Sequence, residues 1–297
     1  MTDESSSTGY GYTVCTIGHS GYSVAMFPIK EELCDYILFT HVYPSNDTLV
    51  SASGNVSYDT FIKVATKHRG GTRTMFGLSH SPHMLSSQLA QDGDGGTTAR
   101  RFLLIADKVF NQTGLSAVGV MGLVRKAADF TKEMRLISWF KEHVFDFLVS
   151  GLKGEQEVEV VLSSTLVFVA YQMNEPVVKP VRFGERCVRN YLQSMEAYCL
   201  QKLLNEEEDA DSVTAVAFNG DTLFSFETPK TVENKMRRFV FALDDKVYRR
   251  VGWAFFDLAF EIYNEALCPV KSNTSNKFSR VAVAKPILEE NRKRKFD

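Results

Sequence analysis

The amino-acid sequence predicts an α/β protein built as a (β/α)8 barrel. Short apolar runs, rich in β-branched and aromatic residues, alternate about eight times with amphipathic helical patterns. Such runs are typical of parallel strands that are buried on both faces, and the alternation favours a parallel sheet covered by helices. The length of 297 residues fits this fold, since such barrels usually need ~250 residues.

The elements follow in order along the chain. The predicted strands are residues 12–18, 36–43, 73–79, 115–121, 158–163, 166–172, 213–219 and 252–258. The predicted helices are residues 97–111, 130–152, 183–204 and 229–243. The last helix has the clearest start, because Thr228 supplies an N-cap hydroxyl and Pro229 occupies the first helical position.

One connection does not fit a complete barrel. Only Ser164 and Thr165 separate the fifth predicted strand from the sixth, whereas a parallel crossover needs about a dozen residues. Either the fifth helix is missing, or the two runs form one bent strand, or they pair antiparallel. These alternatives leave open whether the barrel is complete around strands five and six.

The two ends of the chain fall outside the predicted barrel, which covers residues 12–268. Residues 1–11 begin with a polar, Ser/Thr-rich stretch and are predicted to be a flexible N-terminus. Residues 269–297 lose the apolar pattern and end in four basic residues, 292–295. This composition predicts a disordered basic tail, with a nuclear-localisation signal as the alternative for the basic run.

Cysteines and glycosylation sequons favour a secreted protein. The five cysteines contain no CxxC pair, and their odd number permits two disulfides and one free thiol. Five buried thiols in a cytosolic protein are the alternative. Asn-x-Ser/Thr sequons occur at Asn46, Asn55, Asn111 and Asn273. The sequence contains neither a signal peptide nor a run of eighteen apolar residues, so we expect an extracellular protein whose signal peptide is not part of this sequence and which has no membrane span.

Charge and ligand spacing argue against nucleic-acid, metal and cofactor binding. With 34 Lys+Arg and 36 Asp+Glu, the net charge is -2, which does not favour a nucleic-acid binder. His80 and His83 lack a third metal ligand at a fitting spacing, and the calcium-loop-like run 92–96 has Leu103 at its twelfth position instead of Glu. The acidic run 206–211 is predicted to be a solvated loop. Cys187 is predicted to face the core from its helix.

Three stretches of the chain carry a family resemblance. The first is Val14-Cys15-Thr16-Ile17-Gly18, followed by Phe27-Pro28 and Leu33-Cys34-Asp35-Tyr36-Ile37. The second runs from Thr97-Thr98-Ala99-Arg100-Arg101-Phe102 through residues 114–123. The third comprises Phe218-Asn219-Gly220-Asp221, Phe226-Glu227-Thr228-Pro229, Lys235 and Gly252-Trp253-Ala254-Phe255-Phe256. Together they resemble, over residues 12–268, glycoside hydrolase family 18, the chitinases and chitinase-like proteins, including the diverged members of arthropods such as ticks.

The resemblance implies a (β/α)8 barrel that is cross-linked by disulfides. Cys15 and Cys34 stand where the family has one disulfide, and Cys199 and Cys268 resemble a second one. The chain has no room between residues 219 and 252 for the α+β insertion domain of many chitinases. The ligands implied are polymers of β-1,4-linked N-acetylglucosamine, and no cofactor is implied.

The same resemblance implies that the catalytic acids are missing. Family 18 enzymes end their fourth strand with DxxDxDxE, in which the Glu is the acid and an Asp orients the substrate's acetamido nucleophile. The four acidic positions match Ser116, Gly119, Met121 and Leu123, and residues 114–124 contain no Asp or Glu at all. Because loss of a general acid typically costs about 10²–10⁴-fold in rate, we expect a protein without catalysis.

Two positions are candidates for lining a ligand. Ser79 is the residue that survives from the family's SxGG turn, and Phe256 stands where the family has a Trp below the sugar. A phenyl ring stacks on a sugar with less area than an indole. Trp253 is predicted to be structural.

The leading hypothesis is therefore a secreted, non-catalytic chitinase-like protein. It would bind a chitooligosaccharide or a glycoprotein partner at the carboxyl face of the barrel strands, where barrels keep their sites. The first alternative is an active glycosidase with relocated acidic residues such as Asp221 or Glu227. The second is an interaction scaffold with no affinity for sugar.

Overall fold

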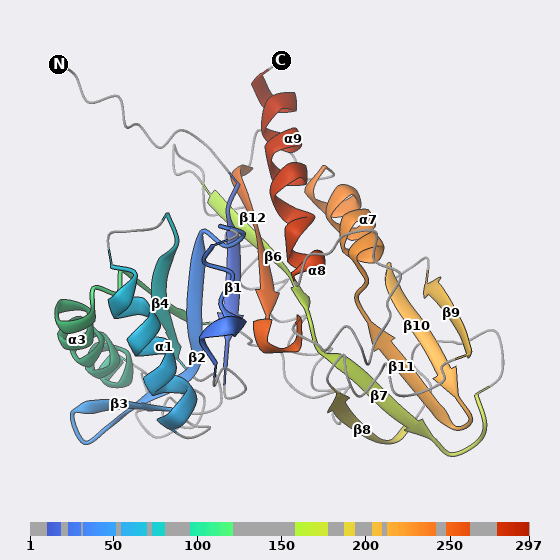
Figure 1. Ribbon diagram of the computed structural model, residues 1–297, viewed down its shortest axis with the longest axis horizontal. Helices are drawn as coiled ribbons and strands as arrows, with labels where there is room; N and C mark the ends of the chain where they lie inside the picture. The colour runs from blue at the N-terminus through green and yellow to red at the C-terminus, as the bar shows by residue number, and fades with distance from the viewer. Residues whose placement is uncertain are drawn as a thin grey trace. The chain divides into compact units, whose positions relative to one another are not determined.

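The computed structural model describes residues 11–18, 23–30, 32–51, 55–69, 73–80, 96–120, 158–177, 187–193, 204–209, 213–241, 248–261 and 278–296. The chain divides into two compact units (Figure 1). The N-terminal unit comprises Thr13–Leu123 and Ala254–Ile262. The C-terminal unit comprises Met1–Tyr12, Val124–Trp253 and Tyr263–Asp297.

The N-terminal unit is built on a parallel sheet. Its strands are β1 (Thr13–Ile17), β2 (Tyr36–Ser45), β3 (Thr48–Ser51), β4 (Met75–His80), β5 (Ala117–Val120) and the end of β12 (Tyr248–Phe256). Its helices are η1 (Val24–Met26), α1 (Asn55–Lys67), α3 (Gly96–Thr113) and η4 (Leu258–Glu261). The strand order is β5-β4-β2-β1-β12, and the pairs β1–β2, β2–β4 and β4–β5 are parallel, while β3 pairs antiparallel with β2. The alternation predicted over the first third of the chain is thus confirmed.

An aromatic cluster forms the core of this unit. Phe61 of α1 lies between Phe39 of β2 and Phe76 of β4, with ring centroids 5.4 and 6.0 Å away. Phe27 approaches Phe61 from the segment after η1, at 6.3 Å. All four side chains are buried, so α1 covers this face of β2 and β4 with large apolar rings.

The predicted disulfide between Cys15 and Cys34 is present. Cys15 lies in β1 and Cys34 precedes β2, and their Cα atoms are 5.8 Å apart. The second predicted pair, Cys199 and Cys268, lies outside the described residues. Cys187 is a free cysteine, as predicted.

The C-terminal unit contains an antiparallel sheet. Its strands are β6 (Val158–Thr165), β7 (Phe168–Met173), β8 (Cys187–Gln193), β9 (Leu204–Asp209), β10 (Thr214–Asn219) and β11 (Thr222–Phe226), and most of β12 also belongs here. The helices are α7 (Pro229–Val240), α8 (Ser279–Ala282) and α9 (Ala284–Phe296). Five strands form the sheet in the order β8-β7-β11-β10-β9, whereas β6 is the neighbour of β12.

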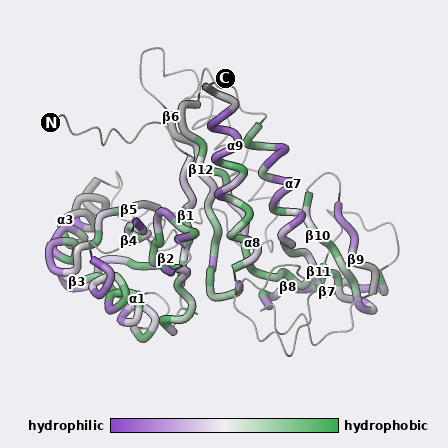
Figure 2. Tube along the Cα trace, turned by 45° about the horizontal axis from the view of Figure 1, so that its top comes forward, coloured by the Kyte–Doolittle hydropathy of each residue, from purple (hydrophilic) through white to green (hydrophobic). Residues whose placement is uncertain are grey.

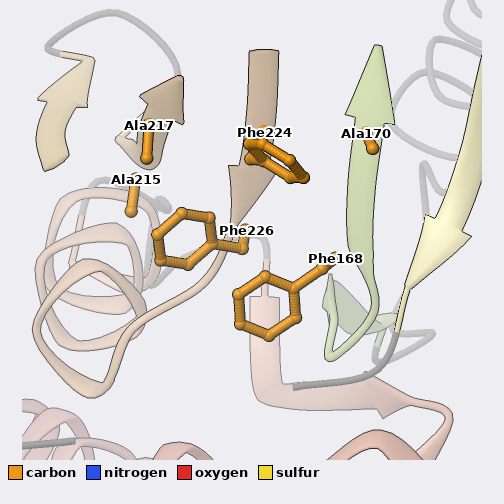
Figure 3. Close-up of a cluster of buried hydrophobic side chains, with 6 residues drawn as sticks. All are labelled: Phe168, Ala170, Ala215, Ala217, Phe224 and Phe226. Atoms are coloured by element: carbon orange, nitrogen blue, oxygen red, sulfur yellow. The ribbon is translucent and has the colours of Figure 1, made fainter. Parts of the chain in front are cut away.

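Alternate residues of three central strands make the core of the antiparallel sheet. Figure 3 shows three phenyl rings and three alanine methyl groups on one face: Phe168, Ala170, Ala215, Ala217, Phe224 and Phe226. The rings of Phe168 and Phe226 stack with centroids 4.7 Å apart. Hydrophilic and hydrophobic segments alternate along α7 and α9, which pack against each other, and α7 also contacts β10 (Figure 2).

The short link between the fifth and sixth predicted strands has a simple explanation. β6 and β7 do not pair with each other, because β6 neighbours β12 while β7 lies between β8 and β11. The run is therefore one bent stretch of chain that leaves one sheet and enters another at Leu166 and Val167. In the described residues the strands make two open sheets, and a complete (β/α)8 barrel is not seen.

Two predictions in the middle of the chain are wrong. Residues 187–193 form the strand β8 instead of a helix, because they pair along their length with β7, so Cys187 is a strand residue. Residues 204–209 form the strand β9 on β10, so most of the acidic run is a strand and not a loop. The helix predicted over 130–152 lies outside the described residues.

The chain end also differs from its prediction. Residues 278–296 form the helices α8 and α9 where a disordered tail is expected, whereas residues 269–277 lie outside the described part. The physical reason is a set of apolar side chains at helical spacing that are buried in this unit: Phe278, Val281, Ala284, Ile287 and Leu288.

Candidate functional site

The carboxyl ends of the parallel strands meet at one edge of the N-terminal sheet. The register places Ile17 of β1 beside Phe39 of β2, and Ser79 of β4 beside Gly119 of β5. Ligands of α/β sheets and barrels bind outside the carboxyl ends of their strands. This edge is therefore the candidate location of a ligand-binding site.

The structure places four of the predicted site residues. Ser79 is fully buried in β4, and its register partner Gly119 lies in β5. Phe256, half-buried, is the last residue of β12. Ser116 precedes β5 at the opposite end of that strand, is exposed, and donates its backbone N–H to Phe76 O at 2.9 Å. Met121 and Leu123 lie outside the described residues.

A polar cluster missed by the sequence analysis surrounds Gly18, directly after β1. Three side-chain atoms lie around the position that a Cβ of Gly18 would occupy: Thr40 Oγ1 at 3.2 Å, Asp257 Oδ1 at 3.5 Å and His41 Nδ1 at 3.8 Å. We call Thr16, Thr40, His41 and Asp257 the Gly18 cluster. A Cβ at position 18 would be in tight contact with Thr40 Oγ1 alone and in ordinary van der Waals contact with the Asp257 and His41 side chains.

Hydrogen bonds fix the members of the Gly18 cluster. Thr16 Oγ1 accepts the backbone N–H of Asp257 at 3.0 Å, and Thr40 Oγ1 donates to the carbonyl of Ile17 at 3.4 Å. His41 Nδ1 lies 2.6 Å from Thr40 Oγ1. When the Thr40 hydroxyl donates to Ile17, Nδ1 of His41 must be the donor to Thr40, which leaves Nε2 as an acceptor.

Backbone strain marks the same cluster. His41 and Asp257 adopt left-handed φ angles of 68° and 65°, which side chains other than glycine rarely take. His41 lies in a register irregularity of β2, between Phe39 and Val42, and Asp257 directly follows β12. Each left-handed residue costs about 1–3 kcal/mol, and such strain concentrates at functional sites. Both residues fall inside predicted strands, 36–43 and 252–258, so the sequence analysis gave no separate signal for them.

The Gly18 cluster combines a carboxylate, an imidazole and two hydroxyls. Such groups can accept from and donate to the hydroxyl and amide groups of a neutral polar ligand. Asp257 is the one carboxylate among its four members. Hydrolysis by the usual two-carboxylate scheme needs a second acid about 5–9.5 Å away, and the cluster itself does not supply it.

The two acids of the enzyme alternative are far apart. Asp221 and Glu227 flank the extended strand β11 (Thr222–Phe226), so six steps of ~3.3 Å put their backbones roughly 20 Å from each other. Asp221 accepts a hydrogen bond from Gln172 Nε2 at 3.3 Å, at the turn between β10 and β11. These two carboxylates therefore cannot flank a single glycosidic bond.

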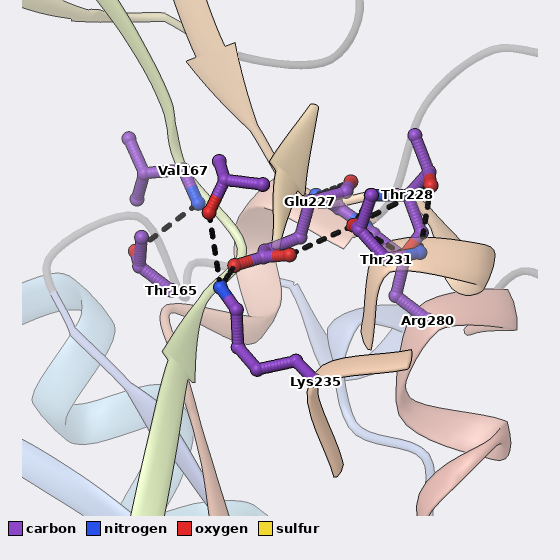
Figure 4. Close-up of polar contacts among 8 residues, drawn as sticks. Thr165, Val167, Glu227, Thr228, Thr231, Lys235 and Arg280 are labelled. Carbon is purple, nitrogen blue, oxygen red and sulfur yellow. Dashed lines mark hydrogen bonds and ion pairs between the residues drawn. The ribbon is translucent and has the colours of Figure 1, made fainter. Parts of the chain in front are cut away.

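Glu227 belongs to a buried structural network (Figure 4). Its residue is only 5% exposed, its Oε1 pairs with Lys235 Nζ, and its Oε2 accepts from Thr231 Oγ1 at 2.8 Å. Lys235 Nζ also donates to Thr214 Oγ1 at 3.1 Å. Burial raises the pKa of the Glu227 carboxyl, while Lys235 and Thr231 act in the opposite direction. The carboxylate thus links the end of β11 to α7.

Arg280 extends this network from α8. Its Nη1 donates to the carbonyl oxygens of Leu166 at 2.9 Å and Glu227 at 3.4 Å, and its guanidinium lies 5.6 Å from the ring centroid of Phe168. Arg280 is 2% exposed, so its charge is held by main-chain acceptors and an aromatic face. This arrangement explains why the chain end is ordered.

Across the described ranges, no three His, Cys, Asp or Glu side chains gather closely enough to hold a metal ion. None of the helices in the described part of the chain is long and apolar enough to cross a membrane.

Comparison with known proteins gives the fold. No protein-family model and no curated protein matches the chain. The solved structure of human YKL-39, titled a pseudo-chitinase with retained chitooligosaccharide binding properties, matches with a TM-score of 0.59 at 10% identity, over 94% of this chain and 100% of that one. The immunomodulatory active chitinase TsES1 of Trichuris suis matches with a TM-score of 0.61 at 9% identity, over 94% and 100%. The GH18 chitinase of Cycas revoluta matches with a TM-score of 0.54 at 10% identity, over 95% and 99%. At the level of fold, the chain is therefore similar to the GH18 chitinases and chitinase-like proteins.

Proposed function

We propose that this protein is a non-catalytic chitinase-like protein that binds N-acetylglucosamine-type glycans at the carboxyl edge of its parallel sheet. The observation that carries the proposal is the polar Gly18 cluster at this edge. The positions that match the family's catalytic acids hold Ser116, Gly119, Met121 and Leu123, none of which can donate a proton at neutral pH.

Binding is supported by the groups that gather at this edge. Asp257 and His41 are both half-buried, and a carboxylate and an imidazole can bond sugar hydroxyl and acetamido groups. Phe256, next to Asp257, offers a half-buried ring that can stack on a sugar face. The fold neighbour YKL-39 is itself titled a pseudo-chitinase that retains chitooligosaccharide binding.

The alternative of an active glycosidase has less support. Asp221 and Glu227 are separated by the whole of β11, and Glu227 is already held by Lys235 and Thr231. Restoring the matched acid alone, with Leu123→Glu, should not restore hydrolysis, because Gly119 and Met121 leave the acetamido group unoriented.

A secreted, glycosylated protein is part of the proposal. The Cys15–Cys34 disulfide fits an oxidising compartment. Asn46 is exposed in the turn between β2 and β3, where its side chain can accept a glycan. Asn111 is also exposed, but its Nδ2 donates to Asp107 Oδ2 within α3 at 3.3 Å.

Calorimetric titration with chitohexaose, followed by chromatography of the same sample, tests the proposal. We expect binding without release of shorter oligomers. Asp257→Asn should weaken binding about tenfold, equivalent to about 1.4 kcal/mol. Asp59→Asn, which removes the same charge at an exposed position of α1, should change nothing. Shorter oligomers would revive the glycosidase hypothesis, and absence of binding would leave a scaffold without sugar affinity.

A further inference from the structure

The Gly18 cluster carries a single formal charge. Thr16 and Thr40 are neutral, and the imidazole of His41 is neutral in the tautomer in which Nδ1 donates to Thr40 Oγ1 and Nε2 accepts. Asp257 is the one carboxylate among the four members. With a neutral imidazole, the cluster therefore presents one negative charge to a ligand.

The main chain of Asp257 is held on both sides. Its backbone N–H donates to Thr16 Oγ1 at 3.0 Å, and its carbonyl oxygen accepts the N–H of Phe260 at 2.9 Å. Its φ of 65° lies in the left-handed region, which Asp and Asn adopt more readily than most other residues. The carboxylate therefore starts from a fixed point between the end of β12 and η4.

Partial burial strengthens the attraction of this carboxylate for a cation. Asp257 is half-buried, and opposite charges attract several times more strongly at such a site than in bulk water. Hydrogen bonds from an ammonium to a carboxylate are also roughly twice as strong as those between neutral groups. A carboxylate has about four lone-pair sites, so Asp257 can keep bonds within the protein and still accept from a ligand.

Chains built from N-acetylglucosamine can present two kinds of nitrogen group. An acetylated unit offers a neutral amide with one N–H donor, and its acetyl group adds a carbonyl oxygen, which a carboxylate repels. A unit that has lost its acetyl group offers an ammonium with three donors and a positive charge. The charge of Asp257 therefore favours the deacetylated unit.

We propose that the Gly18 cluster takes a glucosamine unit of a partly deacetylated chitin chain, whose ammonium pairs with the carboxylate of Asp257. The inference rests on the proposed glycan-binding function and narrows its ligand. We expect a hexamer of glucosamine to bind about tenfold more tightly than chitohexaose, because the ammonium makes a charge-assisted bond that the acetamido group does not make.

Calorimetric titration of the full chain with each hexamer tests this preference. The titration is done near pH 7, where an amine of pKa about 7.7 is mostly protonated and an ordinary histidine is mostly neutral. Asp257→Asn should make the two hexamers bind within about twofold of each other, and its backbone should be kept because Asn tolerates a left-handed φ. Asp59→Asn, which removes the same charge at an exposed position of α1, should keep the tenfold preference.

The outcomes distinguish this inference from the function on which it rests. Chitohexaose binding as tightly as the glucosamine hexamer would overturn the ammonium pairing and leave glycan binding intact. A preference for the glucosamine hexamer that survives Asp257→Asn would mean that the cationic chain binds elsewhere, which also contradicts the inference. Binding of neither hexamer would refute both proposals.

Discussion

At the scale of single residues, the clearest lesson comes from Glu227. The sequence analysis names it as one of the relocated acids of the glycosidase alternative. In the structure its two oxygens are taken by Lys235 and Thr231, and it lies against α7 with almost no exposure. A buried, hydrogen-bonded ion pair explains this residue without any catalytic role.

The stability contributed by Glu227 should depend on pH. Burial raises the pKa of its carboxyl above the ordinary value of about 4.3, so the folded state holds the proton more tightly than the unfolded state. The contribution is then fully present below the unfolded pKa and is lost as pH rises through the folded pKa. Relative to Glu227→Gln, the wild type should lose free energy of unfolding as the pH rises above the ordinary carboxyl pKa of about 4.3. Urea unfolding of both proteins at several pH values measures this difference. If the wild type instead gains free energy of unfolding as the pH rises, the effect of Lys235 on the Glu227 carboxyl outweighs the effect of burial.

Removing the partner of Glu227 should be costly. Lys235→Met leaves the buried carboxylate without its ammonium, and breaking such a pair costs about 3 kcal/mol. Lys230→Met changes an exposed lysine of the same helix and should be nearly neutral. Denaturant unfolding of the two variants measures the difference. Equal stabilities would contradict a structural role for the ion pair.

At the scale of elements, hydrophobic periodicity predicted the helices and strands whose conformation depends on local sequence. β1, β2, β4, β12, α3 and α7 lie close to their predicted positions, and α7 begins at the predicted Thr228 cap, whose Oγ1 accepts the N–H of Thr231 at 3.1 Å. β8 was missed because Val188, Tyr191 and Leu192 have the i, i+3, i+4 spacing of a helix. Pairing with β7 overrides that pattern, and a tertiary contact of this kind is not visible in one segment.

The helices at the chain end were not predicted, because their apolar residues, although at helical spacing, lie among many charged residues. These apolar residues make a direct prediction. Leu288→Ala should lower the free energy of unfolding by about 3 kcal/mol, since the leucine is buried in the C-terminal unit. Lys293→Ala, on the exposed side of α9, should have little effect. Thermal or denaturant unfolding distinguishes the two, and a neutral Leu288→Ala would support the disordered tail that the composition suggests.

At the scale of the whole molecule, the sequence predicted the parallel strands of the N-terminal unit better than it predicted the rest of the fold or the residues of the candidate site. Ser79, Gly119 and Phe256 were proposed from the family resemblance, and they lie in β4, β5 and β12. His41 and Asp257 were not predicted as site residues, because their position around Gly18 depends on a strand irregularity and two left-handed backbone angles. The bend between β6 and β7 was one of three alternatives, and only the different partners of the two strands decide among them.

The number of free thiols tests the secreted hypothesis for the whole chain. With Cys15–Cys34 and Cys199–Cys268 both paired, alkylation of the unfolded protein should modify one cysteine, Cys187, before reduction and all five after it. Intact mass counts the modified thiols and peptide mapping identifies them. Three modified cysteines would leave Cys15–Cys34 as the single bridge, and five would contradict secretion altogether. Each bridge is worth ~3–4 kcal/mol in the chain-entropy model, so the count also decides how much of the stability depends on an oxidising compartment.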